Sequence, residues 1–258
     1  MESLTKKEQG QLLDCLLDMG ELLLDAGAEV SRVEDTLSRV GRAYGAGRMD
    51  VFVITSIISM TMEFPGEEAA TETRRIRSGS STDFVRLERL NELSRECCAE
   101  PLPLSELRAR VDHVTAGRKP FRVIWSGSVL AAGAFAVFFG GTVWDGLAAA
   151  VFGLGICLLQ RWLDRTQLNT AALNLLVSLL VGLGVGGVTK LIPALHMDMI
   201  LIGDIMLLIP GLAMTNAIRN ILLGDTISGV VRLAESLLWA MALAGGIMVS
   251  LLLMEGVL

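Results

Sequence analysis

Residues 166–189 read TQLNTAALNLLVSLLVGLGVGGVT and carry no charged side chain. About 20 such residues in a helix cross the hydrocarbon layer of a bilayer, which is roughly 30 Å thick. In water the same helix would have no polar face to expose. The stretch therefore predicts a transmembrane helix and indicates lipid as the solvent for this part of the chain.

Most of the charged residues precede this stretch. Residues 1–118 hold 36 of the 50 formal charges, as 15 Lys and Arg and 21 Asp and Glu. Residues 119–258 hold the other 14, and most of these lie at the ends of apolar runs. We therefore expect an α+β cytoplasmic domain over residues 1–118, followed by an all-α polytopic membrane domain over residues 119–258.

The composition argues against several kinds of chemistry in the soluble part. Its net charge of −6 disfavours nucleic acid, which needs a basic surface. No phosphate loop, HExxH or GxSxG motif is present, so we expect no enzyme and no cofactor. Free thiols are expected in a reducing compartment, and a Cys97–Cys98 redox pair is the weaker alternative. The cysteines are Cys15, Cys97, Cys98 and Cys157.

Two helices are predicted at the start of the soluble part. The first has apolar residues at helical spacing from Leu12 to Ala26, and Gly27 ends it. Ser31 and Glu34 have the spacing of a capping box for the second helix. Gly45 and Gly47 end that helix, and its expected buried stripe is Val30, Val33, Leu37, Val40 and Tyr44.

A β-meander of about three strands is predicted next. Residues 50–64 form one or two strands, Pro65-Gly66 a turn, and residues 69–77 a returning strand. Residues 80–83 are expected to cap a helix whose apolar face is Phe84, Leu87, Leu90 and Leu93. Pro101 and Pro103 precede a last helix with Leu104, Leu107, Val111 and Val114.

Two charged clusters in this part each have two interpretations. Residues 29–35 are either a binding site or, as we favour, a solvated and capped helix start. The arginines Arg74, Arg75 and Arg77 are either an anion site or, as we favour, a solvated strand edge.

About five membrane spans are predicted, at residues 123–144, 146–160, 166–189, 199–218 and 230–254. Small residues, among them Gly182, Gly245 and Gly246, are expected to let these helices pack closely. Asp145 is expected to cap the second span at the outer surface. We interpret the second span as the short one.

Basic residues near span ends predict the orientation. Residues 1–20 show no signal peptide, which predicts a cytoplasmic N-terminus. Together with the predicted spans, this indicates a multi-pass protein of the cell membrane. Only Lys190 then lies outside, and the C-terminus is outside as well. The basic residues on the cytoplasmic side are Arg118, Lys119, Arg122, Arg161, Arg165, Arg219 and Arg232.

The fourth span carries the candidate site. Residues 203–219 read GDIMLLIPGLAMTNAIR. Pro210 removes a backbone donor, Gly211 eases a break, and broken helices form substrate sites in transporters. Asp204 is an ionisable group in an apolar run, where such groups are costly. A plain kink at Pro210, and for Asp204 an ion pair with Arg232 or a helix-capping role, are the structural alternatives.

Polar residues follow the expected break. Thr215 and Asn216 offer hydrogen bonds, either to a substrate or between helices. The stretch at residues 219–235 is expected to form a cytoplasmic gate or an anion-attracting vestibule, or else a turn with interfacial anchors. Its candidate site residues are Arg219, Asp225, Arg232 and Glu235.

Over nearly its whole length, the chain resembles the N-terminal half of the threonine/serine exporter family. The resemblance rests on five short blocks, at residues 27–34, 144–146, 209–211, 215–217 and 224–229. It implies a cytoplasmic domain followed by transmembrane helices. Longer members of this family resemble two fused membrane halves, and split members work beside a smaller membrane subunit. One such split pair is regarded as exporting dicarboxylates such as succinate.

We therefore expect a membrane subunit of a secondary active exporter for a small polar metabolite, either a threonine- or serine-like amino acid or a dicarboxylate, in antiport with protons. The chain ends after the fifth expected span, so a second, smaller membrane subunit is expected to supply an inverted second half. Assembly of this chain into a homo-oligomer is a further possibility. The alternatives are a membrane-anchored enzyme or sensor domain and a non-transporting assembly or regulatory subunit.

Overall fold

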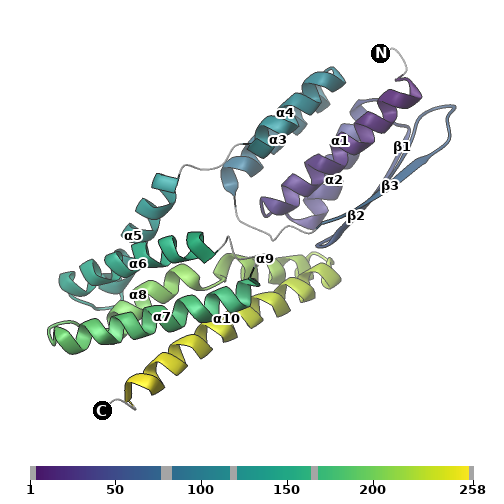
Figure 1. Ribbon diagram of the computed structural model, residues 1–258. Coiled ribbons are helices and arrows are strands. Elements are labelled where there is room, and N and C mark those ends of the chain that lie inside the picture. The colour runs from purple at the N-terminus through teal and green to yellow at the C-terminus, as the bar shows by residue number, and fades with distance from the viewer. Residues whose placement is uncertain (1–3, 77–82, 117–120, 164–167, 256–258) are drawn as a thin grey trace. The chain divides into compact units, whose positions relative to one another are not determined.

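The computed structural model describes residues 4–76, 83–116, 121–163 and 168–255 (Figure 1). The chain divides into two compact units. The first consists of Met1–Arg118 and Thr215–Arg232, and the second of Lys119–Met214 and Leu233–Leu258. The predicted domain boundary between residues 118 and 119 stays a prediction.

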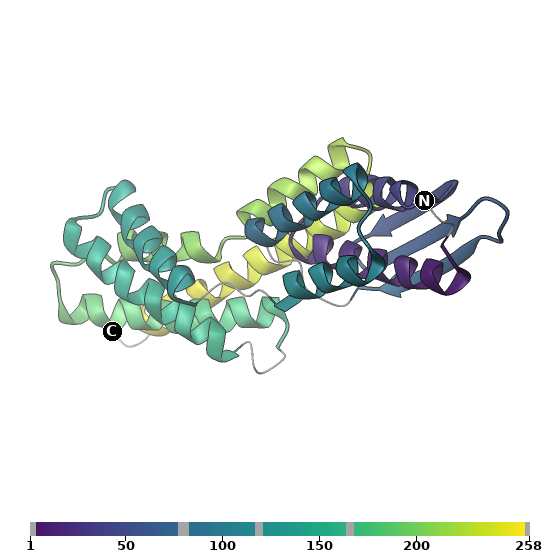
Figure 2. The ribbon, with the colours of Figure 1, turned by 90° about the horizontal axis from the view of Figure 1, so that it is seen from above.

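The first unit stacks three layers, in which a sheet is covered by one helix pair and that pair by another (Figures 1 and 2). The sheet is an antiparallel meander in the order β1-β2-β3, with Arg48 opposite Glu63 and Ile57 opposite Arg75. This confirms the predicted three-stranded meander. The elements are α1 (Lys6–Asp25), α2 (Val30–Ala43), β1 (Arg48–Ile54), β2 (Ile57–Glu63), β3 (Ala70–Arg75), α3 (Phe84–Ala99) and α4 (Leu104–Ala116).

Local sequence signals explain several of these boundaries. Thr5 and Glu8 form a capping box that begins α1, and Gly27, with φ of 90°, follows its end. Gly45, with φ of 95°, follows α2 in the same way. The predicted stripe of α2 is confirmed, because all five of its members are buried in the core of this unit.

Two local predictions in this unit are wrong. Ser31 and Glu34 do not cap α2, which begins at Val30; the Glu34 carboxylate instead accepts a hydrogen bond from the Val53 N–H at 2.9 Å. Phe84 is 62% exposed, so the buried face of α3 rests on Leu90 and Leu93. Asp83 does cap α3, whereas residues 80–82 lie outside the described residues.

The three arginines of the predicted cluster do not share one environment. Arg74 is only 25% exposed and forms ion pairs with Asp14 and Asp18 of α1, so it ties the sheet to the helix layer and is not a solvated edge residue. Arg75 is exposed, and Arg77 lies outside the described residues. All four cysteines are free, as expected, and only Cys98 is exposed.

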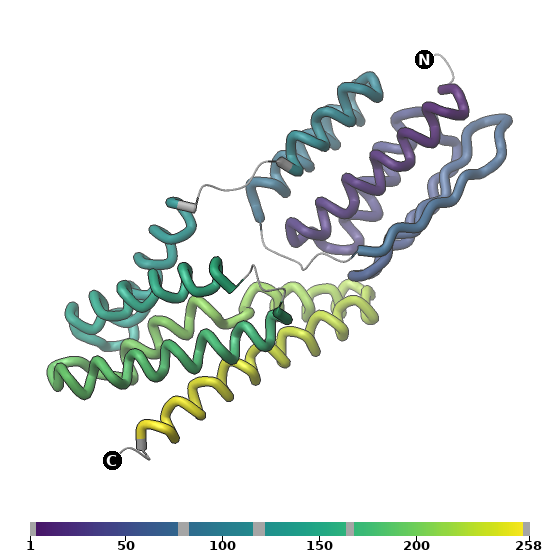
Figure 3. The backbone as a smooth tube through the Cα atoms, viewed as in Figure 1, coloured from purple at the N-terminus to yellow at the C-terminus, as the bar shows by residue number. Residues whose placement is uncertain are grey.

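The remaining helices are apolar and differ in length, and Figure 3 traces their backbone. Among the described residues, α6, α7 and residues Thr226–Met254 of α10 are long and apolar enough to cross a membrane. The pair α8 and α9 passes the same test together but is bent by 49°. The described chain thus has three or four candidate spans, and α5 is a shorter apolar helix. These helices are α5 (Phe121–Phe138), α6 (Val143–Leu163), α7 (Thr170–Leu191), α8 (Met197–Leu208), α9 (Gly211–Leu222) and α10 (Thr226–Glu255).

The first two spans have other boundaries than predicted. The first helix ends at Phe138 because Gly140, with φ of 108°, takes a left-handed turn. The second begins at Val143 and has 21 residues, so it is not short. The total of about five spans stays a prediction.

Only some of the glycines pack as predicted. A Cβ added to Gly246 of α10 would collide with the Ser178 hydroxyl and lie 2.5 Å from the Leu175 carbonyl oxygen of α7. An added Cβ on the adjacent Gly245 would meet no described heavy atom within 4 Å. Close helix contact therefore depends on Gly246 and not on its neighbour.

We predict that Gly246→Leu lowers the thermal unfolding midpoint of the full chain in detergent, because α7 and α10 can no longer approach. The matched variant Gly245→Leu keeps the midpoint of the unsubstituted protein. Both midpoints are measured by the thermal loss of monodisperse protein. Equal midpoints for the two variants would contradict this account of the packing.

Candidate functional site

The fourth predicted span is broken where Pro210 stands. Helix α8 ends at Leu208, and α9 begins at Gly211. Pro210 has no N–H to offer the Met206 carbonyl, and the Gly211 N–H bonds to the Ile209 carbonyl at 2.8 Å instead of continuing the helix. The predicted break is confirmed. It leaves carbonyl groups at the end of α8, and N–H groups at the start of α9, without helical partners.

Asp204 lies two turns before this break and is 0% exposed. Among the described residues, neither of its carboxylate oxygens has a hydrogen-bond partner. The predicted alternative of an ion pair with Arg232 is therefore not found there. A charged carboxylate buried without partners is costly, so this site requires either a proton or a ligand.

The backbone next to Asp204 is packed tightly against α5. A Cβ added to Gly203 would lie 2.6 Å from the carbonyl oxygen of Ala132 and 3.0 Å from the Cβ of Ala136. Helix α8 also contacts α6 and α7 within the same unit. Asp204 is thus held inside a helix bundle and does not face lipid.

The polar residues after the break belong to the first unit. Arg219 of α9 pairs with Glu29, at the start of α2, at 2.7 Å, and the Glu29 side chain is only 15% exposed. Asp225 is half-buried, and its Oδ2 has no partner in the described chain. Burial, chiefly, and also the charge of Asp225 raise the pKa of Glu34, against the lowering effect of the Val53 N–H. Sequence reasoning missed the roles of Glu29 and Glu34.

The structure does not gather the predicted site residues in one unit. Asp204, Pro210, Gly211 and Glu235 belong to the second unit; Thr215, Asn216, Arg219, Asp225 and Arg232 belong to the first. Thr215 and Glu235 are exposed, whereas Asn216 and Arg232 are half-buried. The expected vestibule at residues 219–235 therefore remains a hypothesis, and Arg219 already has an acidic partner.

Asp145 lies in a network that the sequence showed only in part. It forms a capping box with Thr142 at the start of α6, which confirms the predicted cap, whereas its place at the outer surface stays a prediction. It also binds His196, which directly precedes α8. The Thr-x-x-Asp pattern could have indicated the box, but no local signal indicates a partner 51 residues away.

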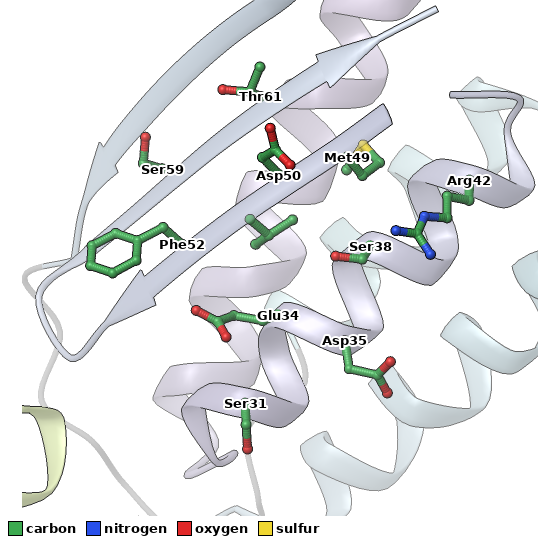
Figure 4. Close-up of a pocket in the computed structure, with 11 residues that line it drawn as sticks. Ser31, Glu34, Asp35, Ser38, Arg42, Met49, Asp50, Phe52, Ser59 and Thr61 are labelled. Atoms are coloured by element: carbon green, nitrogen blue, oxygen red, sulfur yellow. The ribbon is translucent and has the colours of Figure 1, made fainter. Parts of the chain in front are cut away.

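An open groove in the first unit runs between α2 and the edge strand β1, with a volume of about 610 Å³ (Figure 4). Its carboxylates already have partners: Glu34 binds the Val53 N–H, Asp35 pairs with Arg39 and Asp50 pairs with Arg48. No group of three acidic, His or Cys residues in the described chain could hold a metal ion. The groove is therefore a weaker candidate than the broken span. It is lined by Ser31, Glu34, Asp35, Ser38, Arg42, Met49, Asp50, Val51, Phe52, Ser59 and Thr61.

The Glu29–Arg219 pair gives a testable prediction. Arg219→Glu places two carboxylates together, so it should lower stability by about 1 kcal/mol. The double variant Glu29→Arg with Arg219→Glu restores the attraction and most of that loss. Denaturation of the full chain in detergent measures both. Losses that simply add in the double variant would show that the two residues do not interact.

Comparison with known proteins identifies the family. The family model that describes a threonine/serine exporter, ThrE, matches residues 14–254. No curated protein and no solved structure gives a significant match. The matched region contains the broken span, the buried Asp204 and every candidate site residue. The chain therefore belongs to the ThrE family of threonine/serine exporters, whose members are membrane transporters.

Proposed function

We propose that this protein exports a small zwitterionic amino acid, such as threonine or serine, in exchange for protons, and that Asp204 carries the exchanged proton. The observation that supports this most is a carboxylate that is fully buried and unpartnered, two turns from a break in its own helix. A proton is the simplest group that makes such a carboxylate tolerable in a bundle interior.

The break supplies complementary groups for a zwitterion. The carbonyls of Met206 and Leu207 lose their helical donors, since Pro210 has no N–H and the Gly211 N–H turns to Ile209. These oxygens suit the ammonium group of an amino acid. After Gly211, the N–H groups of Leu212 and Ala213 in the first turn of α9 have no helical acceptors, and a helix N-terminus favours a carboxylate. Backbone groups at 206–213 thus bind the cargo, while Asp204 exchanges protons.

The exchange follows from the cost of burying charge. When Asp204 holds its proton, its own side chain is neutral, and the bundle can close around it without cargo. Release of the proton leaves a carboxylate that a bound ammonium group compensates. The two states bind cargo and proton alternately, which is antiport. A dicarboxylate lacks the ammonium group and would not compensate Asp204, so we favour an amino acid over a dicarboxylate as cargo.

The orientation and the partner belong to this proposal as well. The N-terminus lies in the cytoplasm, in keeping with the basic residues Arg122, Arg161, Arg219 and Arg232; Arg118, Lys119 and Arg165 lie outside the described residues. A second, smaller membrane subunit completes the transport path. Vesicles that contain this chain alone, compared with vesicles that contain both chains, separate an exporter subunit from a regulatory one.

We predict that Asp204→Asn abolishes the pH dependence of transport, because the amide cannot take up and release a proton at this site. The chain still folds, since the side chains have nearly the same shape. The measurement is counterflow of labelled serine, threonine and succinate in vesicles, with and without a pH gradient. Asp198→Asn, at an exposed carboxylate in the first turn of α8, is the matched control. If Asp204→Asn transported at the normal rate with the normal pH dependence, Asp204 would not carry the exchanged proton.

A further inference from the structure

Asp145 joins two turns at the same end of the helix bundle. It is fully buried, yet it accepts four hydrogen bonds. Two come from Thr142, from the N–H at 2.7 Å and the hydroxyl at 2.8 Å. The other two come from His196, from the N–H at 2.7 Å and ring Nδ1 at 2.9 Å. An ionised carboxylate accepts from four donors at once, and these bonds offset the cost of its burial.

His196 directly precedes the first residue of α8. It occupies the N-cap position of α8, but its side chain makes no capping bond within the described chain and reaches Asp145 instead. The turn before α6 supports the same helix, since a Cβ added to Gly141 would lie 3.0 Å from the Cβ of Met199. The start of α8 is therefore held by Asp145 and packed on the turn between α5 and α6.

The two ends of α8 differ: the start is held by hydrogen bonds, and the other end is broken. At its start, His196 gives two hydrogen bonds to one buried carboxylate. At its end, the chain leaves the helix at Ile209 and bends by 49° into α9. A helix held at one end and broken at the other can tilt about the held end. Asp204 lies between these two ends.

We propose that Asp145 and His196 form a positioning pair, which fixes the start of α8 and keeps the face that carries Gly203 against α5 while the broken end moves. The pair acts through α8 and does not touch the cargo. The consequence for export rests on the proposed function of Asp204, whereas the mechanical role of the pair does not.

The test measures how often the buried face of α8 opens. Leu201 is a buried residue of α8, and Val177 is a buried residue of α7. In a Cys98→Ser background, Leu201→Cys or Val177→Cys is alkylated with N-ethylmaleimide in the full chain. The same background without either new cysteine corrects for the three buried cysteines. The alkylation rate at each position reports local opening.

We expect His196→Ala and Asp145→Asn to speed alkylation at position 201 by about tenfold, because a hydrogen bond to a charged group is lost. His196→Asn keeps the slow rate, since its amide N–H can take the place of Nδ1–H. Alkylation at position 177 does not change in any variant. These results require no cargo, so they stand apart from the outcome for Asp204→Asn in transport.

Three results would overturn the proposal. The first is a slow rate at position 201 in His196→Ala. The second is an equal rise at positions 201 and 177, which indicates general loss of stability. The third is a rate in His196→Asn as fast as in His196→Ala, which indicates that the hydrogen bond to Asp145 has no part in holding α8.

Discussion

In the hydrocarbon layer there is no water to satisfy backbone and carboxylate groups, and the candidate site depends on this constraint. Most of the apolar helices meet it by bonding their backbone internally. The pair α8 and α9 does not, because Pro210 interrupts the ladder and Asp204 adds a buried carboxylate without a partner. A broken backbone and a buried carboxylate in the same span both destabilise a membrane protein. Export of a polar solute is a function that accounts for both of these features.

The rest of the second unit supports that arrangement. The packing of Gly203 against the Ala132 carbonyl holds α8 close to α5, and the Asp145–His196 hydrogen bonds hold its start. The same Asp145 carboxylate also accepts the capping hydrogen bond at the start of α6, so it holds the starts of two helices. In this proposal, an anchor at one end and a break at the other confine motion to the end where backbone groups lack helical partners. Such confinement is what alternating access requires of a gating element.

The sequence predicted features whose cause is local and missed those whose cause is distant. Pro210 breaks its helix wherever it stands in one, so the break could be located from the residue alone. The meander could be predicted because Pro65-Gly66 separates strands of clear composition. The partner of Glu34 is the Val53 N–H and that of Asp145 is His196, and both lie far along the chain. The end of the first span was misplaced because hydropathy continues through Gly140, while the backbone turns there.

The same division between local and distant causes holds for the candidate site. Asp204, Pro210 and Gly211 lie at or near the break in the fourth span, whereas Arg219 and Asp225 interact with Glu29 and Glu34, residues far away in the sequence. The central claim is that Asp204 exchanges a proton for cargo. The most direct measurement is the internal pH of vesicles, reported by a trapped dye, as serine or threonine leaves them. The account predicts that protons enter as the amino acid leaves and that an imposed pH gradient drives the amino acid uphill. Export with no accompanying proton entry, and no uphill movement, would contradict it.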